Sequence, residues 1–138
     1  MGVRLFLTFM NELIEQIKKA RFIWICGNGG SASTAEHFAT DLVKKGYRAV
    51  ALSSNTSITT MIANDYGYDE IFKKQLKVYG QAGDLLITIS CSGTSPNIVK
   101  AQSLGMPCYE FETFGEETDY GLLEDKHLKF AHEVAKAL

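Results

Sequence analysis

Two short loops of the sequence combine glycines with hydroxyl side chains, and this combination suits the binding of an anion. Residues 27–33 read Gly-Asn-Gly-Gly-Ser-Ala-Ser, and residues 90–96 read Ser-Cys-Ser-Gly-Thr-Ser-Pro. Glycine lets a backbone approach a ligand closely, while hydroxyl and backbone N–H groups donate hydrogen bonds to phosphate oxygens. The loops therefore predict phosphate binding. The plainer interpretation of the second loop is a Ser/Thr-rich turn with one helix-capping serine.

The first loop also contains the pattern G-x-G-x-x-A, which occurs in dinucleotide-binding sites. Such a site needs an acidic residue near the end of the following strand, where it holds the ribose hydroxyls. Residues 51–57 read Ala-Leu-Ser-Ser-Asn-Thr-Ser and contain no acid. The sequence therefore disfavours a dinucleotide, and we expect no nucleotide cofactor.

His37 and Asp41 are residue types that transfer protons or bind metal ions. They are four positions apart, so on a helix both side chains lie on one face, within reach of a single metal ion or substrate. The alternative is an exposed polar flank of the helix that carries an i,i+4 pair.

Strands alternate with helices along the chain, and this order decides where the loops lie. Apolar runs at residues 21–26, 47–52 and 84–90 predict buried strands, and residues 106–112 predict a weaker one. The expected helices span residues 5–20, 33–45, 57–63, 70–79, 95–104 and 120–138. The order predicts an α/β fold, a three-layer doubly wound parallel sheet of four to five strands with helices on both faces. Ligands of such sheets bind beyond the carboxyl ends of the strands, where both loops lie.

Length and composition limit the class of protein. A chain of 138 residues predicts a single domain over residues 1–138. With 14 basic and 16 acidic residues there is no basic stripe, so we expect no nucleic-acid partner. No apolar stretch reaches membrane-spanning length, so we expect no membrane association. The three cysteines show no paired spacing, which predicts free buried thiols and a cytoplasmic location.

Three segments resemble the phosphoheptose isomerase branch of the sugar-isomerase (SIS) family. They are GNGGSASTAEHFATDL, SSNTSITTMIANDYGYDEIF and GDLLITISCSGTSPNIVKA, and the resemblance resumes weakly in the last helix. It implies a flavodoxin-like SIS fold and conversion of sedoheptulose 7-phosphate into D-glycero-D-manno-heptose 7-phosphate, a step of heptose and lipopolysaccharide biosynthesis. Such an aldose–ketose isomerisation passes through an enediol(ate) and needs a general base, a general acid and stabilisation of an oxyanion.

The resemblance also implies roles for individual residues. The implied substrate-binding residues are Asn28, Gly29, Gly30, Ser31, Asp65, Ser90, Ser92, Thr94 and Ser95. The implied catalytic residues are Asp41 and His132. Where zinc is bound, its implied ligands are His37, Asp41, Glu124 and His132. Asp41 stands where the family has glutamate, and Glu124 where it has glutamine. By contrast, His127 lies on the apolar stripe of the last helix, which predicts a packed or hydrogen-bonded histidine.

The chain is shorter than those of the family, with less helix before the first strand and without the strand that precedes the last helix. Family sites lie at subunit interfaces, which implies a homodimer or homotetramer, and the faces of Phe6, Phe9 and Met10 are available for association. Two alternatives to the heptose isomerase stay open. One is a non-catalytic sugar-phosphate-binding module that acts as a regulator or scaffold, and the other is an isomerase of a different phosphosugar.

Overall fold

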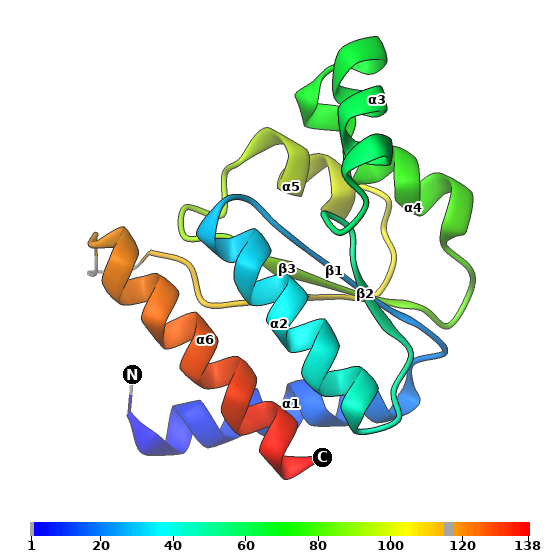
Figure 1. Ribbon diagram of the computed structural model, residues 1–138. Coiled ribbons are helices and arrows are strands. Elements are labelled where there is room, and N and C mark those ends of the chain that lie inside the picture. The colour runs from blue at the N-terminus through cyan, green and yellow to red at the C-terminus, as the bar shows by residue number, and fades with distance from the viewer. Residues whose placement is uncertain (1, 115–117) are drawn as a thin grey trace.

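The computed structural model describes residues 2–114 and 118–138, and its centre is a parallel β-sheet (Figure 1). The strands are β1 (Ile23–Gly27), β2 (Ala49–Ala51), β3 (Leu85–Ile89) and β4 (Cys108–Glu110). Their order is β2-β1-β3-β4, and each neighbouring pair is parallel. The predicted sheet is confirmed, and within the described residues it has four strands. β2 and β4 are shorter than predicted because each is an edge strand with one neighbour.

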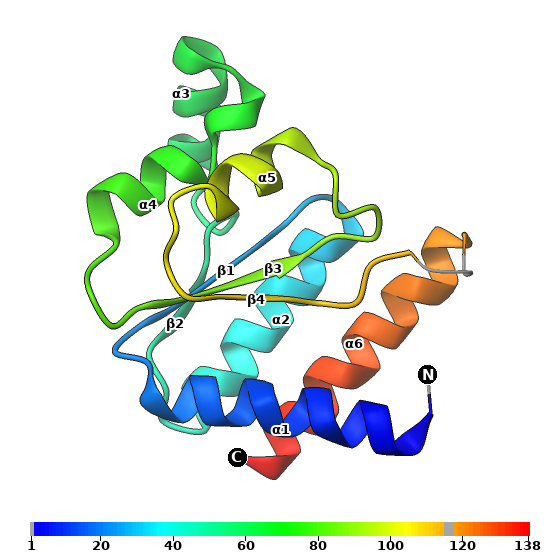
Figure 2. The same ribbon diagram turned by 180° about the vertical axis from the view of Figure 1, so that it is seen from behind.

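Helices cover both faces of the sheet, as Figures 1 and 2 show from opposite sides. One face carries α1 (Val3–Lys19), α2 (Gly30–Lys44) and α6 (Tyr120–Ala137). The other face carries α3 (Thr56–Tyr66), α4 (Lys73–Tyr79) and α5 (Pro96–Gln102), with the 3₁₀ turn η1 (Tyr68–Glu70) between α3 and α4. None of the helices in the described part of the chain is both long and apolar enough to cross a membrane.

The two central strands are buried on both faces, which explains why their sequences are almost continuously apolar. Along β1, Ile23 and Ile25 pack against α1, α2 and α6, whereas Trp24 and Cys26 pack against the helices of the opposite face. This alternation follows from the two-residue period of a strand. The sheet is therefore held rigidly between two apolar layers, and its carboxyl edge can position the loops that follow it.

Helix α2 starts at Gly30, three residues earlier than predicted, because glycines shape the turn that leads into it. Gly29 has φ of 55°, a conformation that glycine adopts without a Cβ penalty. A Cβ on Gly27 would lie 2.7 Å from the carbonyl oxygen of Ser31 and 2.9 Å from that of Ile89. The end of β1 is thus pressed between β3 and the first turn of α2, and the loop is part of the helix start.

Asp84 forms a hydrogen-bonded cluster at the amino end of the strands, opposite the loops. Its buried carboxylate accepts hydrogen bonds from the Arg21 guanidinium at 2.7 and 3.1 Å, from the Trp24 indole at 2.9 Å and from the backbone N–H of Gln81 at 2.9 Å. Burial alone raises the pKa of Asp84, but the bonds from Arg21, Trp24 and Gln81 outweigh it and hold the pKa below its usual value.

Candidate active site

The two predicted loops meet in a small hollow beyond the carboxyl ends of β1 and β3. Its volume is about 130 Å³, and its lining comprises Asn28, Ser31, Ile89, Ser90, Cys91, Ser92, Ser95, Tyr120 and Glu124. Five of the residues predicted to bind substrate are therefore gathered there. Tyr120 and Cys91 were not predicted, although Tyr120 opens the last helix directly after its capping residue. Within the described part of the chain the lining includes no lysine or arginine, so an anion in this hollow would be bound by neutral donors.

The second loop is shaped by its own serines. The Ser90 hydroxyl oxygen accepts a hydrogen bond from the backbone N–H of Gly93, and the Ser92 hydroxyl oxygen accepts one from that of Thr94, both at 3.1 Å. A hydroxyl that accepts in this way keeps its proton for another acceptor. Ser95 is the residue before α5, but its side chain does not cap that helix. The three hydroxyls are thus suited to donate to phosphate oxygens.

Thr94 and Asp65 do not line the hollow. Thr94 is exposed and contributes its backbone N–H to the loop. Asp65 is exposed on α3, where its carboxylate accepts a hydrogen bond from the Asn64 side chain at 3.0 Å. Gly29 and Gly30 supply the backbone of the turn into α2.

A second group of polar residues lies where α2 packs beside α6. The Nε2 atoms of His37 and His132 are 3.1 Å apart, and His37 Nε2 is 3.7 Å from Asp41 Oδ2. One ligand atom from each of the three residues lies within 4.8 Å of the others. Ligand atoms around tetrahedral zinc are about 3.3 Å apart when each bond is about 2.05 Å. The group therefore fits a metal ion, and equally places a carboxylate and two imidazoles around one reacting centre.

Glu124 is separated from this group. It precedes His132 by eight residues on α6, a rise of about 12 Å along the helix axis. Its carboxylate instead lies over the start of α2, in the space that a Cβ on Gly30 would need, and lines the hollow. The predicted four-residue metal set is therefore a three-residue group in this structure. The eight-residue spacing allows two side chains to share a helix face, but the axial rise separates them.

Glu124 is the one charged side chain that the described residues contribute to the lining of the hollow, and its carboxylate acts on Cys91. Burial raises the pKa of the Cys91 thiol, and the Glu124 carboxylate raises it further. A thiol with a raised pKa stays protonated at neutral pH and is a poor nucleophile. Cys91 therefore lines the hollow as a thiol whose environment disfavours the thiolate.

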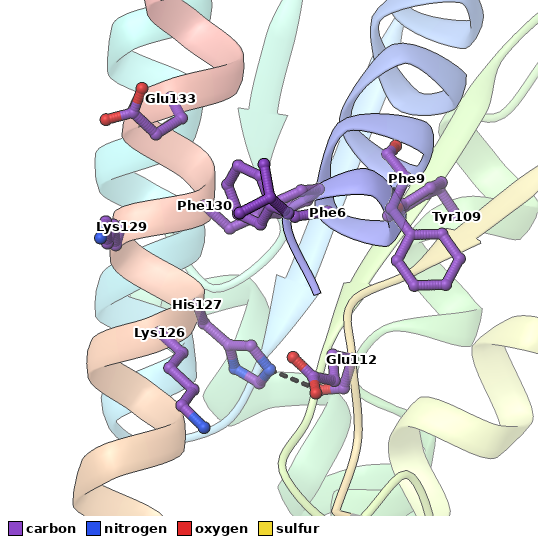
Figure 3. Close-up of a pocket in the computed structure, with 10 residues that line it drawn as sticks. Phe6, Phe9, Tyr109, Glu112, Lys126, His127, Lys129, Phe130 and Glu133 are labelled. Atoms are coloured by element: carbon purple, nitrogen blue, oxygen red, sulfur yellow. Dashed lines mark hydrogen bonds between the residues drawn. The ribbon is translucent and has the colours of Figure 1, made fainter. Parts of the chain in front are cut away.

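A larger groove of about 540 Å³ lies between α1, β4 and α6, and Figure 3 shows its lining. Its lining includes the aromatic rings of Phe6, Phe9, Tyr109 and Phe130, and the rings of Phe6 and Phe130 meet edge to face at 5.6 Å. His127 donates a hydrogen bond from Nε2 to the carbonyl oxygen of Glu112 (Figure 3). Burial lowers the pKa of His127. The prediction of a buried, hydrogen-bonded His127 is confirmed.

The chain matches a family model described as the SIS domain over residues 9–107. It belongs to the SIS family. A phosphoheptose isomerase of Helicobacter pylori (strain P12) is 49% identical over 104 residues, which cover 68% of the chain and 54% of that relative. A phosphoheptose isomerase of Aliarcobacter butzleri (strain RM4018) is 33% identical over 149 residues, which cover 91% of the chain and 79% of that relative.

A solved structure supports the same branch of the SIS family. Phosphoheptose isomerase GmhA from Neisseria gonorrhoeae superposes with a TM-score of 0.89 at 28% sequence identity, over 97% of this chain and 87% of that one. The SIS fold and the phosphoheptose isomerase branch are therefore confirmed. The chain spans about half the length of the first curated relatives that it matches.

Proposed function

We propose that this SIS domain is an aldose–ketose isomerase that converts sedoheptulose 7-phosphate into D-glycero-D-manno-heptose 7-phosphate. One observation carries the proposal: the same pair of packed helices bears the serine-lined hollow at its start and the group of His37, Asp41 and His132 further along. An anion site and a set of proton-transferring residues are what this reaction needs. The names of the relatives support the choice of sugar.

The phosphate binds in the hollow in this proposal. Ser31, Ser90, Ser92 and Ser95 donate their hydroxyl protons to its oxygens, and the N-terminal turn of α2 adds a favourable dipole. The binding energy of this remote group holds the sugar so that its reacting carbons lie beside the catalytic residues. The remaining residues implied by the resemblance, Asp65 among them, stay proposed sugar contacts.

Asp41 and His132 share the proton transfers. Starting from the ketose, a proton leaves C1 and the carbonyl oxygen on C2 gains one, which forms the enediol. The hydroxyl on C1 then loses its proton while C2 gains one, and the product is the aldose. The carboxylate and the imidazole lie in one group with His37, close enough to act on the two neighbouring carbons of one substrate.

The same three residues would hold a zinc ion, which would polarise the substrate carbonyl as a Lewis acid. Two imidazole nitrogens and a carboxylate oxygen are a donor set typical of catalytic zinc. Glu124 was predicted as a fourth ligand, and in the structure its carboxylate lines the hollow instead.

Further proposals concern the protein as a whole. Residues 1–138 form one domain around the single sheet, and copies of the chain associate as a homodimer or homotetramer whose sites lie at subunit interfaces. The enzyme acts in the cytoplasm, in the biosynthesis of heptose. Light scattering coupled to size-exclusion chromatography measures the oligomer, and a monomeric mass would contradict the proposed association.

The test is turnover of sedoheptulose 7-phosphate, measured with added zinc and again after chelation. Zinc-dependent formation of the aldose supports the reaction and the metal together. Turnover that a chelator leaves unchanged would remove the metal and keep the acid–base pair. Absence of turnover with tight binding of the sugar phosphate would replace the isomerase with a non-catalytic binding module, and turnover of another phosphosugar alone would replace the substrate.

A further inference from the structure

Asn97 is a buried polar residue in the first turn of α5, directly after the serine loop. It is 2% exposed. Its carboxamide forms a reciprocal pair with that of Asn28: Asn97 Nδ2 donates to Asn28 Oδ1 at 2.8 Å, and Asn28 Nδ2 donates to Asn97 Oδ1 at 2.9 Å. The pair connects the loop after β1 with the helix that follows β3, and its Asn28 member lines the hollow.

Tyr68 completes the surroundings of Asn28. The Tyr68 hydroxyl, from η1, donates to the same Asn28 Oδ1 atom at 3.1 Å. An amide oxygen has two lone pairs, and an amide nitrogen has two N–H groups. Among the hydrogen bonds of the described residues, the Asn28 oxygen thus uses both lone pairs and its nitrogen uses one N–H. Asn28 lines the hollow, so the group that it has left for a ligand is a donor.

We propose that Asn97 is a positioning residue, which holds the Asn28 amide so that it presents an N–H to an oxygen of the bound sugar phosphate. The identity of that ligand rests on the proposed function, whereas the fixed orientation of Asn28 does not. An amide that rotates freely presents its oxygen as often as its nitrogen, and the oxygen repels an anionic acceptor. Asn97 therefore acts on affinity through Asn28, without touching the substrate.

Within the described residues, both side-chain hydrogen bonds of Asn97 are made with Asn28. This distinguishes Asn97 from a residue that only stabilises α5. A buried amide that serves the fold alone is usually satisfied by the backbone. Gln75 is an example in this chain, because its buried side chain donates to the carbonyl oxygens of Leu52 and Ile71.

The orientation is tested without any ligand. NMR identifies the side-chain amide signals of Asn28 by their loss in Asn28→Ala, and their exchange with solvent is then measured. We expect the Asn28 N–H that is bonded to Asn97 to be protected in the unmodified chain and its protection to fall at least about tenfold in Asn97→Ala. The Ile98→Ala variant, which removes a buried side chain from the same helix, is expected to keep the protection. Equal exchange in the unmodified chain and Asn97→Ala would overturn the proposal.

The effect on binding is tested by titration calorimetry with sedoheptulose 7-phosphate. We expect Asn97→Ala to weaken affinity about tenfold, as the loss of one hydrogen bond to a charged group does. In the Asn28→Ala background the same substitution is expected to change nothing, because Asn97 acts through Asn28. An additive loss in the double variant would overturn the positioning role. If the unmodified chain binds no sugar phosphate, the proposed function fails, and the exchange measurement alone decides the role of Asn97.

Discussion

At the scale of single residues, the group of His37, Asp41 and His132 allows the sharpest separation of chemistry from binding. Asp41→Asn and His132→Ala are each expected to reduce turnover by at least about 10²-fold, the usual contribution of a general acid or base. Affinity for the sugar phosphate is expected to stay within a few-fold, because the phosphate binds in the hollow. Steady-state kinetics and calorimetry measure the two effects.

A matched control is Glu36→Gln, which removes an exposed carboxylate from the same helix beside His37. The Glu36 carboxylate accepts a hydrogen bond from Ser53 and is not part of the group of His37, Asp41 and His132. We expect it to leave turnover unchanged. Equal losses of turnover and affinity in the Asp41 and His132 variants would contradict their catalytic assignment.

Glu124 makes a different prediction, because its negative charge lies in a hollow proposed to hold a phosphate. Replacing it with glutamine keeps the shape and removes the repulsion between two anions. We expect Glu124→Gln to bind inorganic phosphate several-fold more tightly in metal-free protein, since like charges within a few ångströms repel appreciably in a partly buried site. Titration calorimetry measures the change.

The same variant discriminates between the two positions considered for Glu124. A residue of the metal group would, when replaced, weaken zinc binding and leave phosphate binding alone. If Glu124→Gln leaves the affinity for phosphate unchanged and weakens zinc binding, Glu124 is a zinc ligand, as the sequence predicted. Asp125→Asn, a neighbouring exposed position of α6, serves as the control for a general change in charge.

At the scale of elements, the turn from β1 into α2 has no room for a side chain. Gly27→Ala would place a Cβ 2.7 Å from one backbone carbonyl oxygen and 2.9 Å from another, and neither can move independently. We expect a loss of about 1–3 kcal/mol in the free energy of unfolding, the usual cost of overpacking. Chemical denaturation measures it. Gly2→Ala has nothing within 4 Å of the new methyl group and is expected to be neutral. Equal stability of both variants would contradict the close packing of this turn.

The Asp84 cluster at the other end of the sheet predicts a pH dependence of stability. Because the pKa of Asp84 is lowered in the folded protein, its contribution is present above the unfolded pKa of about 3.9 and is lost as pH falls below it. Asp84→Asn is expected to destabilise the protein by about 1–3 kcal/mol at pH 7, because the buried hydrogen bonds lose their charged acceptor while the partly exposed Arg21 stays solvated. The difference between the variant and the unmodified chain is expected to shrink as the pH falls below about 4. A difference that is independent of pH in denaturation curves would contradict the role of the charge.

Much of this architecture could be predicted from sequence because its signals are local. Apolar runs predict buried strands, and the glycine and serine loops follow two of them, so the hollow could be placed at the carboxyl edge. The His37–Asp41 pair could be predicted from helical spacing alone. Side-chain contacts that depend on tertiary packing could not be predicted from the sequence. Nothing in the spacing indicates that Glu124 lies over Gly30, or that Asn97 pairs with Asn28 from 69 residues away.

At the scale of the whole molecule, a metal ion between α2 and α6 would join two helices that are far apart in sequence. A ligand that binds the folded state alone stabilises it by about 2.7 kcal/mol at a hundred times its dissociation constant. We therefore expect zinc to raise the melting temperature and a chelator to reverse the rise. Magnesium, which prefers oxygen ligands, is expected to have little effect. His37→Ala is expected to abolish the response to zinc, and a response that persists in this variant would place the ion elsewhere.

The distance between the hollow and the group of His37, Asp41 and His132, measured along the packed helices α2 and α6, affects which sugars can react. Ser31 lines the hollow and His37 belongs to the proposed catalytic group, and the six positions that separate them along α2 correspond to about 9 Å. In the proposed enzyme this stretch of helix sets the distance between the bound phosphate and the carbons that exchange a proton. Selection by carbon-chain length then requires no contact with the middle of the sugar. A pentose phosphate anchored in the same hollow would fall short of the catalytic group, and would bind without reacting.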